Sequence, residues 1–404
     1  MDKDKIVISG IGSISPFGYT LEDFWKGIIG QYQIDTIFTD YDTFLNVPSI
    51  KEIIIQKWNP ESILEKKGLK YMTKSTQLLL SSAVLSHQKD DFYADTEIGV
   101  TVATNFSGVQ PVSEYDYTIL TEGPQYVSPM QAPNTLTNAP SAQLALKVNA
   151  RAFNTTLSTG QCSSINSIIY GAESIQKNIS KCAFVSGVEE INKRTNWLYY
   201  NMNLLENSEY CGVPYNQNSN CIIPSEGSGT LFLETYKNCI KRKKAPLAYI
   251  NSYTESYNYD RNKLKNDIIS NINETLAKNT DNINITAIFS GANGIYENDS
   301  IELSAIKEVF KNHSSLKISP IKGRTGDTYG NSGIFQVISA ILAFKFKTIP
   351  YALNIENGNV QNENYQNFNY NFDKDDGILI LSWDSSGNIC LLYTSPSPRD
   401  RQKS

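Results

Sequence analysis

Short runs of β-branched and other apolar residues alternate along this chain with longer segments in which apolar positions recur at helical spacing. Residues 163–177 show that spacing most clearly, because their isoleucines and one alanine fall on a single helical face. Strands are expected at 6–10, 98–103, 153–158 and 183–188, and helices beginning at Thr20 and over 69–87 and 163–177. The first half therefore predicts strand–helix–strand units.

The second half repeats this alternation. Strands are expected at 230–234, 248–252, 285–290, 316–319 and 377–383, and helices at 262–276, 299–310 and 332–346. Such alternation predicts an α/β fold in which helices cover the sheets. The similar alternation in the two halves is compatible with a diverged duplication, although no sequence identity recurs at a fixed period. A basic segment, 237–246, lies between them.

Composition narrows the classes of function. Over 404 residues, 36 Lys and Arg stand against 41 Asp and Glu, so a nucleic-acid binder is not expected. Only two histidines are present, His87 and His313, which argues against a multi-histidine metal site. No cofactor motif is convincing. The most apolar stretch, 333–346, is too short to span a membrane, and the N-terminus lacks a signal-like apolar run. A cytoplasmic protein is expected.

The six cysteines form no CxxC pair, which predicts unpaired thiols in a reducing compartment. The last residues, 393–404, change abruptly to Pro, Ser and Arg without apolar periodicity. This segment resembles a non-native extension, and we exclude it from the expected fold.

Two glycine-containing loops follow predicted strands. The first, Gly10 to Ser15, nearly matches the dinucleotide fingerprint, but Ser15 takes the third glycine position and Pro16 follows. A structural turn is therefore favoured over nucleotide binding.

The second loop, 158–164, reads STGQCSS and precedes the helix at 163–177. A cysteine at a helix N-terminus can be held as a thiolate, and the free N–H groups there can hold an oxyanion. The sequence leaves two interpretations of Cys162 open, an activated nucleophile and a buried structural cysteine.

An ordered series of motifs resembles the β-ketoacyl-acyl carrier protein synthases, the ketosynthases of fatty acid and polyketide assembly. The series comprises VISGIGSISPFG at 7–18, TGQCSS at 159–164, EGSGTLFLE at 226–234 and SPIKGRTGDTYGNSG at 319–333. The resemblance covers about residues 5 to 392. It implies a thiolase-type fold, with two similar α/β halves, 1–244 and 245–392, forming a five-layer αβαβα sandwich. It also implies Cys162 as the acyl-accepting nucleophile and an acyl carrier protein as partner.

The chain departs from the family where its two active-site histidines would lie. Asn293 stands in for the first histidine, and Asp327 replaces the second, whereas Lys322 and Gly326 of that block are kept. The phenylalanine loop has become SWDSSGN at 382–388, in which Ser385 and Gly387 are expected to help form the oxyanion hole. Neither His87 nor His313 falls in a motif. We expect His87 to end the 69–87 helix and His313 to lie in an exposed loop.

These replacements predict impaired condensation. Asn293 keeps an amide donor, but an ionised Asp327 would oppose the charge of the malonyl group and raise the pKa of Cys162 unless Lys322 pairs with it. Three alternatives stay open: a ketosynthase with an altered condensing site, an acyltransferase that loads Cys162 and serves another acceptor, and a non-catalytic partner like the chain-length factors. Chain-length factors typically lose the cysteine.

The resemblance further implies a dimer, either of this chain or with another ketosynthase. Pro133, Asn134 and the segment 138–147 resemble the dimer-forming region. The basic run between the halves, with Lys237 and 241–244, allows docking of an acidic carrier protein but is more simply a solvated connector.

Overall fold

The computed structural model describes residues 5–32, 36–39, 50–87, 92–205, 210–278, 284–356, 358–360, 364–373 and 375–396. Each strand and helix expected from the sequence is present in it. The strands are β1 (Ile6–Ile14), β2 (Thr36–Thr39), β3 (Ile50–Ile53), β4 (Ile98–Ala103), β5 (Phe153–Leu157), β6 (Cys182–Glu189), β7 (Gly227–Thr235), β8 (Ala248–Tyr257), β9 (Asn284–Phe289), β10 (Leu316–Ser319), β11 (Thr348–Glu356), β12 (Asn359–Val360), β13 (Gln366–Asn369), β14 (Asp376–Trp383) and β15 (Asn388–Pro396).

The helices cover and separate these strands. They are α1 (Leu21–Ile28), α2 (Lys74–Ser86), α3 (Val109–Thr121), α4 (Ala139–Val148), α5 (Ser163–Gln176), α6 (Lys193–Asn201), α7 (Tyr236–Lys241), α8 (Leu264–Ala277), α9 (Tyr296–Val309), α10 (Lys322–Thr325) and α11 (Ser332–Phe346).

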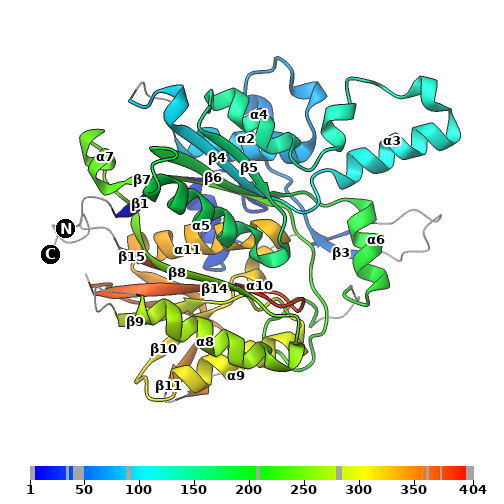
Figure 1. Ribbon diagram of the computed structural model, residues 1–404. Coiled ribbons are helices and arrows are strands. Elements are labelled where there is room, and N and C mark those ends of the chain that lie inside the picture. The colour runs from blue at the N-terminus through cyan, green and yellow to red at the C-terminus, as the bar shows by residue number, and fades with distance from the viewer. Residues whose placement is uncertain are drawn as a thin grey trace.

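Five layers are visible in Figure 1. Helices α2 and α4 cover the strands of the first half, α8 and α9 cover those of the second half, and α5 and α11 lie between the two layers of strands. This confirms the predicted α/β fold class and its five-layer arrangement. The predicted division at 244/245 falls in the connection between α7 and β8.

The two layers of strands are joined through the N-terminal strand. On one side β1 pairs antiparallel with β7 from Ile6 to Ile14, and on the other side it pairs with β8 through Val7 and Ile8. Within the described residues the strand order is therefore continuous: β12-β11-β10-β9-β14-β15-β8-β1-β7-β6-β4-β5, with β13 beside β11.

The central layer explains why 332–346 is so apolar. Every residue of α11 from Ser332 to Phe344 is buried, because strands lie on both sides of this helix. A helix that is apolar all round is typical of such a core position. Among the described residues, no helix is both long and apolar enough to cross a bilayer.

Helix starts follow local side-chain chemistry. Thr20 caps α1 by accepting a hydrogen bond from the backbone N–H of Asp23, as predicted. The helix predicted at 69–87 begins later, because Thr73 caps α2 and a separate turn precedes it. His87 terminates α2, as predicted, whereas His313 after α9 is half-buried against Phe310.

The exclusion of residues 393–404 from the fold is wrong for the first four of them. Strand β15 continues through Pro396 and pairs with β8, and Tyr393 is fully buried. The change of composition hides this continuation, because strand pairing needs only backbone N–H and C=O groups. Residues 397–404 lie outside the described residues.

The prediction of six unpaired thiols is wrong for one pair. Cys211 and Cys221 form a disulfide with Cα atoms 5.1 Å apart, in the range usual for such bonds. The loop between Cys211 and Cys221 brings the two residues together, and their spacing in the sequence alone does not predict this. The four other cysteines are buried and form no disulfide within the described residues.

A substitution tests whether the end of β15 belongs to the core. Tyr393→Ala should lower the free energy of unfolding by about 3–5 kcal/mol, the usual cost of truncating a buried aromatic residue. Tyr257→Ala removes the same side chain from an exposed position on the paired strand β8 and should cost about 0.5 kcal/mol or less. Urea denaturation measures both, and equal effects would contradict the assignment of 393–396 to the core.

Candidate functional site

The loop between β5 and α5 brings its residues to the centre of the molecule. Gly160 takes a positive φ of 67°, and an added Cβ there would clash with the carboxylate of Asp384. Asn105 fixes the turn by accepting a hydrogen bond from the Gly160 N–H and donating one to its carbonyl. The turn then passes through Gln161 and Cys162 into α5.

Three predicted site residues from the second half meet beside this loop. Asn293 donates from Nδ2 to Asp327 Oδ2 at 2.8 Å, and Lys322 Nζ lies 3.7 Å from Asp327 Oδ1. The side chains of Lys322 and Asp327 are both buried, with 3% and 2% exposed. The structure thus brings Asn293, Lys322 and Asp327 together, as the resemblance implied.

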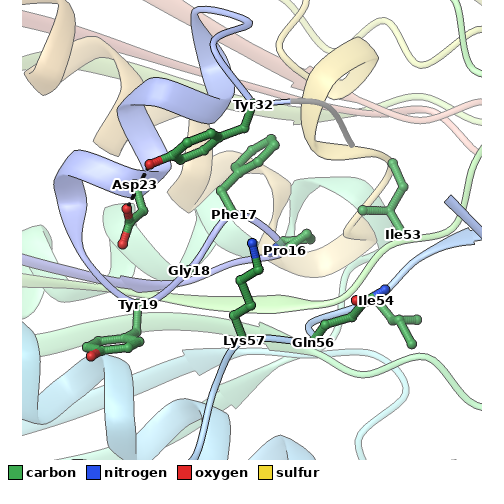
Figure 2. Close-up of a pocket in the computed structure, with 10 residues that line it drawn as sticks. All are labelled: Pro16, Phe17, Gly18, Tyr19, Asp23, Tyr32, Ile53, Ile54, Gln56 and Lys57. Atoms are coloured by element: carbon green, nitrogen blue, oxygen red, sulfur yellow. Dashed lines mark hydrogen bonds between the residues drawn. The ribbon is translucent and has the colours of Figure 1, made fainter. Parts of the chain in front are cut away.

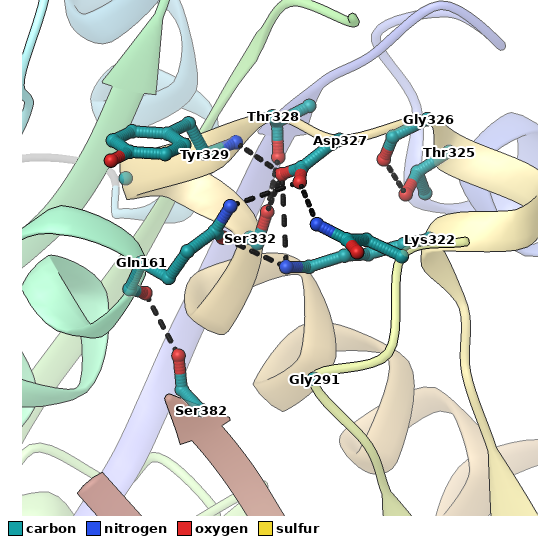
Figure 3. Close-up of polar contacts among 12 residues, drawn as sticks. Gln161, Gly291, Lys322, Thr325, Gly326, Asp327, Thr328, Tyr329, Ser332 and Ser382 are labelled. Atoms are coloured by element: carbon teal, nitrogen blue, oxygen red, sulfur yellow. Dashed lines mark hydrogen bonds and ion pairs between the residues drawn. The ribbon is translucent and has the colours of Figure 1, made fainter. Parts of the chain in front are cut away.

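The residue of the nucleophile loop that completes this cluster is Gln161. Its Nε2 donates to Asp327 Oδ2 at 2.9 Å, and its Oε1 accepts from Lys322 Nζ at 2.8 Å. Figure 3 shows these side chains pointing toward one another. The sequence reasoning missed Gln161, although its position directly before Cys162 was the available signal.

Cys162 points elsewhere. Its side chain is fully buried among apolar residues of the central layer, and its Sγ donates to the carbonyl of Ser382 at 3.3 Å. It shares no hydrogen bond with Asn293, Lys322 or Asp327 in the described part of the chain. It is Gln161 that contacts Asp327, so the role of Cys162 as the acyl-accepting nucleophile stays a prediction.

Of the two interpretations of Cys162 that the sequence left open, its electrostatics favour the buried structural cysteine. Burial raises the pKa of the Cys162 thiol well above its ordinary value, and the neighbouring Cys390 and Asp384 raise it further. The start of α5 does not offset these effects, because a thiolate with no water around it is strongly disfavoured. At neutral pH Cys162 is a thiol.

Asp327, by contrast, is a buried carboxylate that is kept ionised. Burial alone would raise its pKa, but the charge of Lys322 and hydrogen bonds from Asn293, Gln161 and the backbone N–H of Tyr329 hold the pKa below its ordinary value. Removing such a partner from a buried charge is costly. The cluster is therefore a buried polar core in which Lys322, Gln161 and Asn293 each donate to another member of the cluster.

A second pair of acids supports the segment that carries Asn293. Asp299 accepts from the backbone N–H groups of Asn293 and Gly294, and Glu302 accepts from that of Gly291 and from Tyr215 and Trp383. Burial raises the pKa of Asp299 to about 6 and that of Glu302 to about 7. These acids hold the loop in place through their hydrogen bonds to its backbone.

The predicted oxyanion residues lie in the turn between β14 and β15. Gly387 takes a φ of 106° and packs against Asn258, whose N–H donates to the Gly387 carbonyl. Within the described residues, neither Ser385 nor Gly387 shares a hydrogen bond with Cys162, so their role stays a prediction. The loop residue that does reach Gly160 is Asp384, which the sequence reasoning did not single out.

Three cavities lie away from this cluster. One of about 450 Å³ lies between the Pro16–Tyr19 turn and residues 53–57 (Figure 2). Two others, of about 690 and 990 Å³, lie beside the start of α2 and between α2 and α4. None of the three is lined by Gln161, Asn293, Lys322 or Asp327. Among the described residues, no group of three His, Cys, Asp or Glu side chains is placed to hold a metal ion.

Comparisons with known proteins cover nearly the whole chain. Residues 3–238 match the family model of the β-ketoacyl synthase N-terminal domain, and residues 251–356 match that of the C-terminal domain. The chain is 23% identical over 377 residues to 3-oxoacyl-[acyl-carrier-protein] synthase 2 of Synechocystis, covering 88% of this chain and 89% of that protein. It is 22% identical over 371 residues to the chloroplastic synthase I of Arabidopsis thaliana, covering 84% and 76%.

Solved structures share the fold. The ishigamide ketosynthase/chain length factor superposes with a TM-score of 0.84 at 18% identity, covering 98% of this chain and 99% of the other. A type II polyketide ketosynthase in complex with its acyl carrier protein, AntDE:AntF, gives a TM-score of 0.78 at 17% identity, covering 98% and 100%.

The position of Cys162 predicts low reactivity. Iodoacetamide at pH 7 should label Cys162 in the native protein at least about 100-fold more slowly than in the unfolded protein, because the thiol is buried and its pKa is raised. Peptide mass spectrometry of native and urea-unfolded samples measures both rates. Preferential labelling of native Cys162 would show that it is an activated nucleophile.

The raised pKa of Glu302 predicts a pH dependence. The group has a pKa of 4.5 when unfolded and about 7 when folded, so its protonated form favours folding, and its contribution to stability falls as pH rises from 4.5 to about 7. Glu302→Gln stays neutral, so its stability relative to the wild type should rise by about 1–3 kcal/mol across this window. Urea denaturation from pH 5 to 8 measures it, with the exposed Glu297→Gln as control. If the stability of the wild type and of Glu302→Gln changed in parallel with pH, the raised pKa of Glu302 would be contradicted.

Proposed function

Because this chain belongs to the β-ketoacyl synthase family, we propose that it is a non-condensing member that pairs with an active ketosynthase and handles acyl chains delivered by an acyl carrier protein. The motifs of this chain resemble those of the ketosynthases, which agrees with a ketosynthase-like acyltransferase of fatty acid and polyketide assembly. The narrower proposal concerns what this particular chain does within that family.

The observation that carries the proposal is the identity of the side chain at the centre of the site. Gln161, and not Cys162, faces Lys322 and Asp327. A carboxamide is not one of the side chains that form covalent acyl intermediates, whereas a thiol is. A site built around Gln161 therefore lacks the group to which an acyl chain would be transferred.

The charge of the site argues in the same direction. Condensation builds negative charge on the malonyl thioester oxygen, and losing one hydrogen-bond donor to such an oxygen costs roughly 10²–10³ in rate. Asn293 donates to Asp327, and the ionised Asp327 would repel both the enolate and the malonyl carboxylate. Two histidine positions are thus filled by groups that stabilise each other rather than a substrate.

An apolar surface on the first half supports pairing. Helix α3 has no buried residue, and apolar side chains on it, on the following loop and on α4 are exposed. The most exposed of them are Tyr117, Leu120, Tyr126, Met130, Leu136 and Leu146. Strand β5 ends the strand order and leaves one edge without a strand in the described residues. Exposed apolar patches and open strand edges mark association surfaces.

A second candidate function remains, in which Cys162 accepts an acyl group. It is favoured by the place of Cys162 at the start of α5 and by the nearby carboxylate of Asp384, which could serve as a general base. This candidate requires the Cys162 side chain to leave the Ser382 carbonyl and turn toward the polar cluster.

The proposed compartment is the cytoplasm. Four buried cysteines without a disulfide support it, whereas the Cys211–Cys221 pair is less typical of a reducing compartment.

Two measurements distinguish the candidate functions: whether this chain gains an acyl group, and whether it forms a heterodimer with an active ketosynthase. Incubated alone with acyl-carrier protein and malonyl-carrier protein, the chain should gain no acyl mass and form no condensation product. Co-expressed with a conventional Cys-His-His ketosynthase from the same gene neighbourhood, it should purify as a heterodimer that condenses. Intact-mass spectrometry and size-exclusion chromatography measure these outcomes.

Two other results would contradict the proposal. An acyl adduct that disappears in Cys162→Ala would favour the second candidate. A homodimer that condenses malonyl units by itself would rule out the proposed non-condensing, paired role.

A further inference from the structure

A small apolar cluster lies directly beside the polar site. Its centre is a set of three aromatic rings, Phe106, Tyr199 and Tyr329, which we call the aromatic cluster. Phe106 and Tyr329 have ring centroids 5.0 Å apart, Phe106 and Tyr199 6.0 Å, and Tyr199 and Tyr329 6.1 Å. Ile50, Leu205 and Ile222 pack around these rings.

Tyr329 joins this cluster to the polar site. Its backbone N–H donates to Asp327 Oδ1 at 2.8 Å, and its phenol oxygen lies 3.8 Å from where a Cβ on Gly160 would stand. Figure 3 shows Tyr329 next to Gln161 and Asp327. The ring therefore separates the turn that carries Gln161 from the other two rings.

The backbone of Tyr329 is strained. Its φ of 45° is in the left-handed region, which a bulky residue seldom adopts. Such strain persists only where the surroundings fix it, and it is concentrated at functional positions. Here Asp327, which accepts from the Tyr329 N–H, holds the strained residue in place.

We propose that the Tyr329 side chain is a specificity-determining gate that closes the position of Gln161 to the hydrocarbon chain of an acyl thioester. This inference deepens the proposed function and rests on it. The ring is a gate rather than a fixed wall because Tyr329 is only half-buried and its phenol makes no hydrogen bond within the described residues.

The chemistry of the surroundings defines the ligand class. On one side of Tyr329 lies a buried polar cluster whose members donate to one another. On the other side lie aromatic and aliphatic side chains that bind hydrocarbon by the hydrophobic effect. Rotation of Tyr329 would connect the two, so that a hydrocarbon chain could replace ring contacts within the aromatic cluster.

An introduced thiol at position 161 reports access. In a Cys162→Ala background, Gln161→Cys is treated with iodoacetamide and with an iodoacetamide that carries a decyl chain, and peptide mass spectrometry follows labelling at position 161. With Tyr329 intact both reactions should be slow. Tyr329→Ala should speed labelling by the decyl reagent about tenfold or more, because it removes the ring that closes the passage.

Three further variants make the result specific. Tyr329→Phe keeps the ring and should label at the parent rate. Tyr329→Gly suits the left-handed backbone and should label as fast as Tyr329→Ala. Tyr200→Ala removes a half-buried tyrosine at the margin of the same cluster and should leave the rate unchanged. Thermal melts confirm that each variant folds.

Equal rates with and without the Tyr329 ring, or equal acceleration by Tyr200→Ala, would overturn the gate. This test needs no carrier protein and no partner subunit. Failure of the gate would therefore leave pairing with a ketosynthase unaffected, and failure of pairing would leave the labelling result unaffected.

Discussion

The buried carboxylate of Asp327 is the constraint around which the centre of this molecule is organised. Its side chain draws in Lys322, Gln161, Asn293 and the backbone of Tyr329. Its own backbone N–H and carbonyl are bound by residues 223 and 225. A single charge far from water thus ties together segments from both halves, because every group that can neutralise it must come to it.

This arrangement changes what the family fold can do here. In a working condensing site, donors must remain free to meet the substrate. In this chain the corresponding groups satisfy one another, so the site is a stable polar core with Gln161 at its centre. The proposed loss of condensation and the internal pairing are therefore two aspects of the same set of substitutions.

Much of the fold could be predicted from the sequence, because strands and helices with clear apolar periodicity, such as α11 and β4, carry their own signal. The meeting of Asn293, Lys322 and Asp327 followed from motif order. The direction of Cys162 did not. Two adjacent residues after the turn at Gly160 point to different environments, and composition does not reveal which one faces the site. The end of β15 was missed because its pairing depends on the backbone of a distant strand.

The position of β1 has a consequence for synthesis of the chain. This strand is made long before its partners β7 and β8, which begin at Gly227 and Ala248. Emerging from the ribosome, it has no neighbour with which to complete its hydrogen bonds until most of the first half and the start of the second have been translated. Contacts so distant in sequence form slowly and leave apolar strand edges open in the meantime. We therefore expect the first half to need chaperones while the chain is being synthesised. Its assembly is completed only when β8 has been translated and can pair with β1.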